Sequence, residues 1–350
     1  MNKTKLLILV AIVGVIILGA ALYFMSSFSK VPTYESSNSA NEHFLIGLSL
    51  GTLQEERWQK DADLFTKRAE ELGAVVEVKY SGENANLQIS QAENLIIQGV
   101  KVLVVVPYDA ATAGVIVDKA HAAGVKVIAY DRMISNSDVD LFITFDSRML
   151  GKLQAETIIA EVPQGKYAYV GGSSTDNNAA LLKEGSMKVL APYISNGSIT
   201  LVSDTFNLNW SPEEAYKTIK TYLASGKKLD AVIAANDGTA GGVIRALEEY
   251  GLAGKVPVSG QDADVAASRR VVAGTQTMTI YKSLSELANK AAEQAVLLAQ
   301  GKSVSVNGSL NNGKIDVPSY FLDPVVVTKK NIDEAIIKTG FHTREEVYSK

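Results

Sequence analysis

The chain of 350 residues contains no cysteine. This absence excludes disulfide bonds, thiolate metal ligands, cysteine nucleophiles and a lipidated N-terminal cysteine. Histidine is also scarce, with only His43, His121 and His342 present. No two of them have the spacing of a metal site and none follows a predicted strand, so we expect structural or surface roles. The sequence therefore predicts neither a metal site nor a cofactor.

Motifs of nucleotide binding and hydrolysis are missing as well. There is no G-x-S-x-G, no P-loop, and no G-x-G-x-x-G that opens a helix after the first strand. The glycine-rich segment 238–242 lacks the P-loop lysine and predicts a tight turn from strand to helix. The net charge is −4 and the lysines and arginines are scattered among acids. The sequence therefore shows no basic patch of the kind that binds nucleic acid. We expect no catalytic residues and no nucleic-acid partner.

One long hydrophobic run is present, at residues 6–25, and Lys3 and Lys5 precede it. Twenty residues at about 1.5 Å each match a hydrocarbon core of roughly 30 Å. The run is longer than the apolar part of a cleaved signal and ends in bulky residues where cleavage needs small ones. We therefore expect a membrane anchor with residues 1–5 in the cytoplasm, and a cleaved signal is the alternative. Both place the folded part outside the cytoplasm, after a Ser- and Asn-rich linker at 26–42.

From residue 43 onward, strand and helix patterns alternate, which is typical of an α/β fold with parallel sheets. The first series of predicted strands covers 44–50, 75–80, 100–107, 125–130 and 141–145, and the second covers 167–172, 199–205, 231–236 and 256–260. Two series favour two Rossmann-like lobes joined by a hinge, because one sheet of this width is unusual. Segments 275–281 and 320–328 are predicted to return across the hinge.

These patterns divide the chain into two discontinuous lobes with a three-segment hinge. The N-terminal lobe is predicted to contain residues 43–147 and 278–317. The C-terminal lobe is predicted to contain residues 148–277 and 318–350.

Polar side chains follow the carboxyl ends of these predicted strands. In an open parallel sheet such ends meet at one crevice, where ligands bind. The candidate binding residues are Arg57, Asp131, Arg132, Asp176, Asn178, Asn236, Asp262 and Lys282, with Trp210 added from a loop.

Guanidinium groups and carboxylates together suit vicinal hydroxyl groups, which both donate and accept hydrogen bonds. The three acids and three bases balance, so we expect an uncharged ligand. Trp210 lies outside any apolar stripe and can either stack on a sugar ring or anchor its loop. Trp58 lies on the apolar stripe of the first helix, which predicts a packing residue.

Several segments carry a family resemblance: ERWQKD at 56–61, AYDRMI at 129–134, DNNA at 176–179, AANDGTAGG at 234–242, SGQDAD at 259–264, GTQTMTIYK at 274–282 and LNNGKIDVPS at 310–319. With them the chain resembles the type I periplasmic sugar-binding proteins of ABC transporters, and within that family its xylose-binding members. The resemblance implies two lobes that close on a pyranose. It also implies that the nine candidate residues contact D-xylose or a related aldopentose.

The N-terminus departs from this family, because the chain keeps a membrane-length run and has no cysteine. The departure favours a tethered receptor that reports extracellular xylose to a membrane histidine kinase. Delivery of xylose to an ABC permease is the alternative. A sugar isomerase or aldolase with the aspartates around a metal is less favoured, since the candidate ions pair with one another and leave no perturbed base.

Overall fold

A computed structural model of the protein describes residues 44–349 apart from residue 56. The predicted anchor at 6–25 and the linker at 26–42 lie outside the described residues. Within the described part, no helix is both long and apolar enough to cross a membrane.

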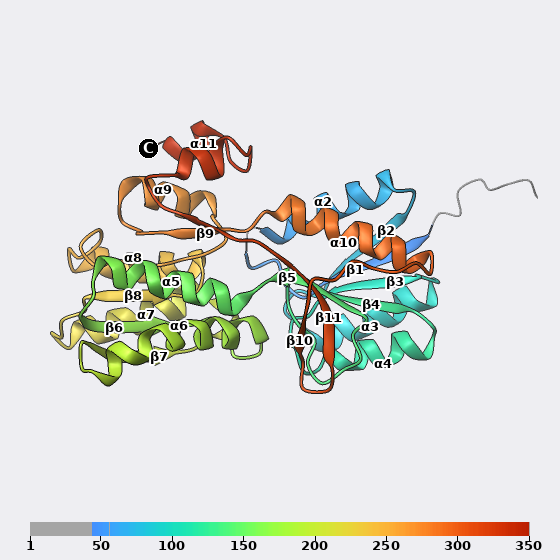
Figure 1. The fold of residues 1–350 in the computed structure, drawn as a ribbon, viewed down its shortest axis with the longest axis horizontal. Helices are drawn as coiled ribbons and strands as arrows, with labels where there is room; N and C mark the ends of the chain where they lie inside the picture. Colours follow the sequence, from blue (N-terminus) through green and yellow to red (C-terminus); the bar gives the residue numbers. More distant parts are fainter. Residues whose placement is uncertain (1–43, 56, 350) are drawn as a thin grey trace, which may run out of the picture. The chain divides into compact units, whose positions relative to one another are not determined.

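The first of the sheets is built mainly from the N-terminal third of the chain (Figure 1). Its order is β10 (Gly308–Asn311), β11 (Asp316–Leu322), β5 (Leu141–Phe145), β4 (Lys126–Tyr130), β3 (Val102–Val106), β1 (Leu45–Leu50) and β2 (Val75–Tyr80). All neighbours pair in parallel except β10 and β11. The predicted strands of the first series agree with the observed ones to within two residues at each end.

Helices cover both faces of this sheet, so its central strands are apolar throughout. Helices α2 (Arg57–Glu71) and α10 (Leu284–Ala299) pack side by side on one face, although they are far apart in sequence (Figure 1). Helices α3 (Ala85–Ile97) and α4 (Gly114–Ala122) cover the other face. Strand β3 shows the alternation: Val104 faces the α2 side and Val105 faces the α3 side.

The second sheet has the order β7 (Ile199–Thr205), β6 (Gly165–Val170) and β8 (Ala231–Ala234), all parallel. Two pairs of helices enclose it: α5 (Ser147–Glu161) and α6 (Asn177–Ser195) on one face, α7 (Pro212–Ala224) and α8 (Asp237–Glu249) on the other.

The prediction of a strand at 256–260 was wrong, because this segment forms only the single bridge Val232–Val258. Pro257 has no N–H to donate to a ladder. The Ser259 hydroxyl bonds to both the N–H and the backbone oxygen of Ala234, where the next bonds of a ladder with β8 would form. Both effects interrupt the pairing.

A small third sheet pairs β9 (Thr279–Tyr281) with β12 (Val325–Val327) in antiparallel fashion. Helix α9 (Val265–Ala273), the short helix η2 (Asp333–Ile337) and α11 (Arg344–Tyr348) pack beside it around a separate core. The chain thus crosses between the two large α/β units three times: after β5, between β9 and α10, and between β11 and β12.

Two of the predicted lobe limits differ from the strand pairing. Residues 318–322 were placed in the C-terminal lobe, but they belong to β11 of the first sheet. The break comes at Asp323-Pro324, where proline removes the next ladder donor. The return crossing falls near Ser283, whose hydroxyl accepts a bond from Glu286 N and begins α10, and not before residue 278.

Helices α5 and α6 cross very closely, and glycine makes this possible. A Cβ atom on Gly151 would lie 2.0 Å from the backbone oxygen of Leu182, and one on Gly185 would lie 2.0 Å from that of Arg148. Both contacts are with backbone, which cannot turn away as a side chain can. The close crossing fixes the start of α6, which carries two of the candidate residues.

We expect Gly151→Ala to lower the free energy of unfolding by about 1–3 kcal/mol, because the added methyl group must push the two helices apart. Urea denaturation measures this loss. Gly114→Ala, in α4, is the matched control, since its Cβ would meet neighbours only at 3.6 Å and beyond. Equal stability of the two variants would contradict the close-crossing argument.

Candidate functional site

A small cavity of about 20 Å³ lies where the strand ends of the two units meet. The residues that line it are Glu55, Arg57, Trp58, Asp131, Arg132, Asp176, Asn178, Trp210, Asn236, Gln261, Asp262 and Lys282. All nine residues predicted from the sequence are among them. Their contact with a sugar stays a prediction, but the structure brings them together around one point.

Each side chain is positioned by a strand end or by the first turn of a helix. Arg57 begins α2 after β1, and Lys282 follows β9. Asp176 is the N-cap of α6 and accepts from Asn178 N at 2.9 Å. Asn236 is the N-cap of α8 in a capping box with Thr239. The caps fix both side chains, so the same residues begin the helices and face the cavity.

Three cavity residues have left-handed backbone conformations that are uncommon outside glycine: Asp131 with φ 60°, Trp210 with φ 56° and Asp262 with φ 98°. Such conformations cost about 1–3 kcal/mol each and gather at functional sites, where the surrounding structure enforces them. Here they turn the side chain that follows a strand or loop toward the cavity.

Buried ion pairs link the two units. Arg132 Nε lies 2.9 Å from Asp176 Oδ2, and Arg57 Nη1 lies 3.7 Å from Asp262 Oδ1. In both pairs the cation comes from the first unit and the carboxylate from the second. All four side chains are at most 8% exposed, so water screens these pairs poorly.

Further ion pairs lie within each unit. Arg57 also contacts Asp131 at 2.8 Å and Asp61 at 2.8 Å, and Lys282 contacts Asp262 at 2.8 Å. Every cation of the cavity thus has at least one buried carboxylate partner.

Hydrogen bonds complete the wall of the cavity. The indole N–H of Trp210 donates to Asp176 at 3.1 Å, and Asn178 Nδ2 donates to the backbone oxygen of Asp131 at 2.9 Å, across the two units. Among the described residues, Arg57 Nη2, Asn178 Oδ1 and Gln261 Oε1 are buried without a protein partner. Buried polar atoms are normally satisfied, so these three indicate where a ligand or water bonds.

The pKa values follow from burial and from these pairs. Burial opposes the charge of Asp131, but the attraction of Arg57, Lys282 and Arg132 outweighs it and lowers the pKa of the carboxyl. For Asp176, burial exceeds the attraction of Arg132 and raises the pKa. Burial also opposes the charge of Arg57, yet its three carboxylate neighbours raise its pKa well above the usual value.

Three lining residues were missed by the sequence analysis. Glu55 lies 2.8 Å from Arg132 and accepts from the indole N–H of Trp58. Trp58 is buried in the core as predicted, but its ring also lies beneath Arg57, with the guanidinium carbon 4.5 Å from the ring centroid. Gln261 immediately precedes Asp262. Glu55 lies in the loop between β1 and Arg57, and Gln261 adjoins Asp262, so a search of the loops beside the candidate residues would have found both.

Glu55 changes the charge balance of the site. The lining holds four carboxylates against three cations. An anionic ligand such as a sugar phosphate would therefore be repelled, while a neutral polyol can accept from the cations and donate to the carboxylates.

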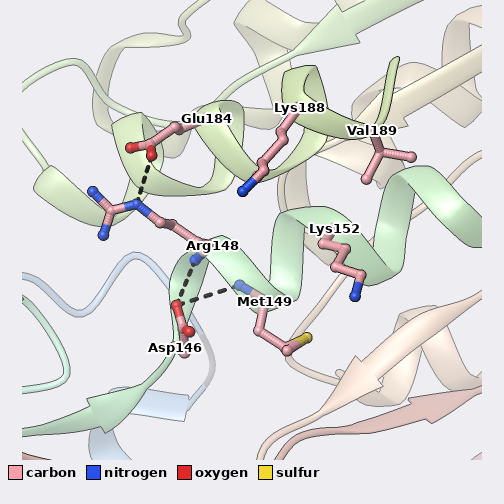
Figure 2. A pocket seen from close by; sticks show the side chains of 8 residues that line it. Asp146, Arg148, Met149, Lys152, Glu184, Lys188 and Val189 are labelled. Atoms are coloured by element: carbon pink, nitrogen blue, oxygen red, sulfur yellow. Dashed lines mark hydrogen bonds and ion pairs between the residues drawn. The ribbon is translucent and has the colours of Figure 1, made fainter. Parts of the chain in front are cut away.

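A larger cavity of about 310 Å³ lies between α5 and α6, and its chemistry differs (Figure 2). Arg148 pairs with Glu184 at 2.7 Å, but their side chains are 43% and 57% exposed. The Asp146 carboxylate is engaged with the backbone N–H groups of Arg148 and Met149. Exposed pairs of this kind are weak and orient a ligand poorly. The small cavity between the units, with its buried polar groups, is the better candidate.

Two α/β units with a polar cavity between their strand ends define a ligand-binding protein rather than a structural one. The sequence model of the periplasmic binding protein domain family matches residues 46–303 of this chain. The chain therefore belongs to this family. The family binds ligands without transforming them, which agrees with the expectation of no catalytic residues.

Two relatives match this chain over most of its length. The chain is 50% identical over 303 residues to the D-xylose-binding periplasmic protein of Escherichia coli (strain K12), covering 86% of this chain and 92% of that protein. It is 47% identical over 317 residues to the D-xylose-binding periplasmic protein of Haemophilus influenzae, covering 90% and 96% respectively.

Among solved structures, an ABC transporter solute-binding protein from Clostridium phytofermentans with bound β-D-glucose is similar with a TM-score of 0.82. It is 32% identical, and the match covers 87% of this chain and 99% of that chain. The predicted two-lobed α/β fold of this family is therefore confirmed.

Beneath the cavity lies a further buried acid, Asp237, at the first position of α8. Its carboxylate accepts from Gln276 Nε2 at 2.7 Å and from the Thr279 hydroxyl at 2.8 Å. Burial is the main cause that raises its pKa to about 7; Asp262 adds to the rise and Arg270 opposes it.

The stability of the protein should consequently fall as pH rises from about 4 to about 7. In this range the unfolded chain releases the Asp237 proton while the folded protein keeps it, so unfolding becomes more favourable. The rise of the pKa from 3.8 to about 7 corresponds to about 4 kcal/mol. Asp237→Asn cannot ionise and should remove this part of the pH dependence.

Urea unfolding at pH 4.5 and 7.5, for the wild type and for Asp237→Asn, measures the difference. Asp118→Asn, on the exposed side of α4, is the control and should keep the wild-type slope. An unchanged slope in Asp237→Asn would show that this carboxyl is already ionised throughout the range.

Proposed function

We propose that this protein is an extracytoplasmic receptor for D-xylose or a closely related aldopentose, bound reversibly between the two lobes. The observation that carries the proposal is the convergence of nine strand-end and loop residues on one buried polar cavity. Two relatives at 47% and 50% identity, both named as D-xylose-binding periplasmic proteins, support this choice of sugar.

The chemistry of the cavity supports a neutral sugar. Each hydroxyl group can donate to a carboxylate such as Asp131 and accept from a cation such as Arg132, and the unpartnered Arg57 Nη2 and Asn178 Oδ1 provide one donor and one acceptor. The indole faces of Trp58 and Trp210 are suited to the C–H face of the ring.

Binding requires movement of the lobes. A volume of about 20 Å³ holds about one water molecule, far less than a sugar ring. The lobes must therefore move apart, or side chains must turn, to admit the ligand. We propose a hinge at the three crossings, with sugar hydroxyls replacing part of the Arg132–Asp176 and Arg57–Asp262 attraction when the lobes close.

We expect Asp262→Ala and Arg132→Ala each to weaken xylose binding by about 2–4 kcal/mol, or roughly 30- to 1000-fold, because each leaves buried partners without a counter-charge. Trp210→Ala should cost less, about 1–3 kcal/mol, since it removes stacking area and leaves no buried charge unpaired. Calorimetric titration with xylose measures each value. Arg344→Ala breaks the exposed pair with Asp333 and serves as the control. Wild-type affinity in Asp262→Ala would reject this pocket.

Delivery of the sugar to an ABC permease is the role we propose first. The sequence alone favours signalling to a histidine kinase over transport, and we propose the opposite order. Solved relatives described as ABC transporter solute-binding proteins support transport, and none of the comparisons supports a histidine kinase partner.

Signalling to a membrane histidine kinase is the second candidate, favoured by one feature. The sequence has an apolar run at 6–25 and no cysteine for a lipid anchor. A tether would hold the receptor near a membrane partner at high effective concentration.

Purification of the full-length chain from membranes, with and without xylose, separates the two roles. For transport we expect co-purification with a permease. Capture of a histidine kinase and no permease, strengthened by xylose, would overturn transport in favour of signalling. N-terminal sequencing of the same sample shows whether residues 6–25 are retained.

A further inference from the structure

A second set of contacts joins the two lobes at the rim of the cavity, away from the ion pairs. The Tyr108 hydroxyl donates to Asn209 Oδ1 at 2.9 Å, and Asn209 Nδ2 donates to Glu83 Oε2 at 3.1 Å. Tyr108 follows β3 and Glu83 follows β2, both in the N-terminal lobe, whereas Asn209 lies in η1 (Leu208–Trp210) of the C-terminal lobe. Both polar atoms of the Asn209 side chain thus form hydrogen bonds with the N-terminal lobe.

The N-terminal partners of Asn209 are themselves held in place. Glu83 Oε1 accepts from the Thr52 hydroxyl at 3.3 Å. Tyr108 N donates to Gln88 Oε1 at 2.9 Å. Nearby, Ala110 N donates to the backbone oxygen of Thr175 at 3.1 Å, again across the lobes. Glu83, Tyr108 and Asn209 are half-buried and Thr52 and Gln88 are buried, so water competes only in part for the bonds.

The backbone at this point is unusual. Asn209 and Trp210 are consecutive residues with φ of 52° and 56°. Asparagine is among the residues that tolerate this region best, but tryptophan is not. The Trp210 ring packs on the backbone of Gly172, where a Cβ would lie 2.4 Å from the ring, and its indole N–H bonds to Asp176. Contacts around this turn must stabilise its strained backbone so that the Trp210 ring stays in this position.

We propose that Glu83, Tyr108 and Asn209 form a rim latch that positions Trp210 and retains the bound sugar. The inference rests on the proposed sugar-binding role of the cavity. The latch closes only when the lobes approach, and it holds the residue directly before the tryptophan of the cavity wall. None of the three latch residues lines the small cavity, whereas Trp210 does, so Asn209 acts as a positioning residue.

The latch should act on the release of sugar more than on its capture. Its bonds must break before the lobes can open, and they are absent when the open form meets a sugar. Tyr108→Phe removes one bond and should raise the xylose dissociation rate about 3- to 10-fold. Asn209→Gly removes both bonds yet permits the left-handed backbone, and should raise it about 10- to 100-fold.

The decisive experiment is a double-mutant cycle on the intact protein. Stopped-flow tryptophan fluorescence follows xylose dissociation, because both tryptophans of the chain line the cavity. If Tyr108 acts through Asn209, the double variant Tyr108→Phe/Asn209→Gly should release xylose no faster than Asn209→Gly alone. Multiplied effects of the two substitutions would overturn the coupling.

Tyr222→Phe is the matched control. Tyr222 is also half-buried, and its hydroxyl donates to Lys228 O at 3.1 Å within one lobe. Its dissociation rate should equal that of the wild type. Equal rates in Tyr108→Phe and Tyr222→Phe would contradict the latch.

Small-angle scattering of sugar-free protein provides a readout that does not need the ligand. We expect a larger radius of gyration in Asn209→Gly than in the wild type, because the open form gains population. Absence of xylose binding in the wild type would reject the proposed function but leave this comparison valid. An unchanged radius in Asn209→Gly would reject the latch alone.

Discussion

The arrangement of the protein depends on buried ion pairs that cross from one lobe to the other. Arg132 and Arg57 project from the first unit toward Asp176 and Asp262 of the second. Separation of the lobes would take Arg132 away from Asp176, and a buried charge without a partner costs several kcal/mol unless water or a ligand replaces that partner. The same groups that hold the lobes together therefore make the cavity ready for a molecule with many hydroxyl groups. In the proposed function, sugar binding and lobe closure share this electrostatic constraint.

The course of the backbone brings these charged side chains close to the cavity. Parallel strands of both sheets end at the same boundary, so the residue after each strand already faces the other unit. Helix caps at Asp176 and Asn236 and the left-handed residues Asp131 and Asp262 then set the direction of each side chain. Because these positions are fixed by backbone geometry, the cavity wall is rigid within each lobe and the freedom lies between the lobes.

Much of this could be predicted from the sequence, because strand ends are marked by the change from β-branched to polar residues. Strands β2, β5 and β7 agree residue by residue with prediction, and eight lining residues were found from their position after predicted strands, with Trp210 added from its loop. The crossing points were less accurate: the run 320–328 continues past the break at Asp323-Pro324, while the run 275–281 ends before the return crossing, which only Ser283 marks. Trp58 was assigned to the core alone, since periodicity shows which face is buried but not that the same ring also borders a cavity. The contacts of Asn209 are between residues distant in sequence and have no local signal.

A second layer of hydrogen bonds beneath the cavity joins three elements of the C-terminal lobe. Arg270 of α9 donates to the backbone oxygen of Asp237 and to Gln276, and Gln276 donates in turn to the Asp237 carboxylate. Thr279 of β9 bonds to the same carboxylate, so the start of α8, helix α9 and the strand leading to the return crossing share one acceptor. Displacing any of them would leave a deeply buried carboxyl with fewer donors, which carries a desolvation cost. In the proposed mechanism the movement that admits a ligand is confined to the three crossings, and the rim contacts between the lobes break when the lobes separate.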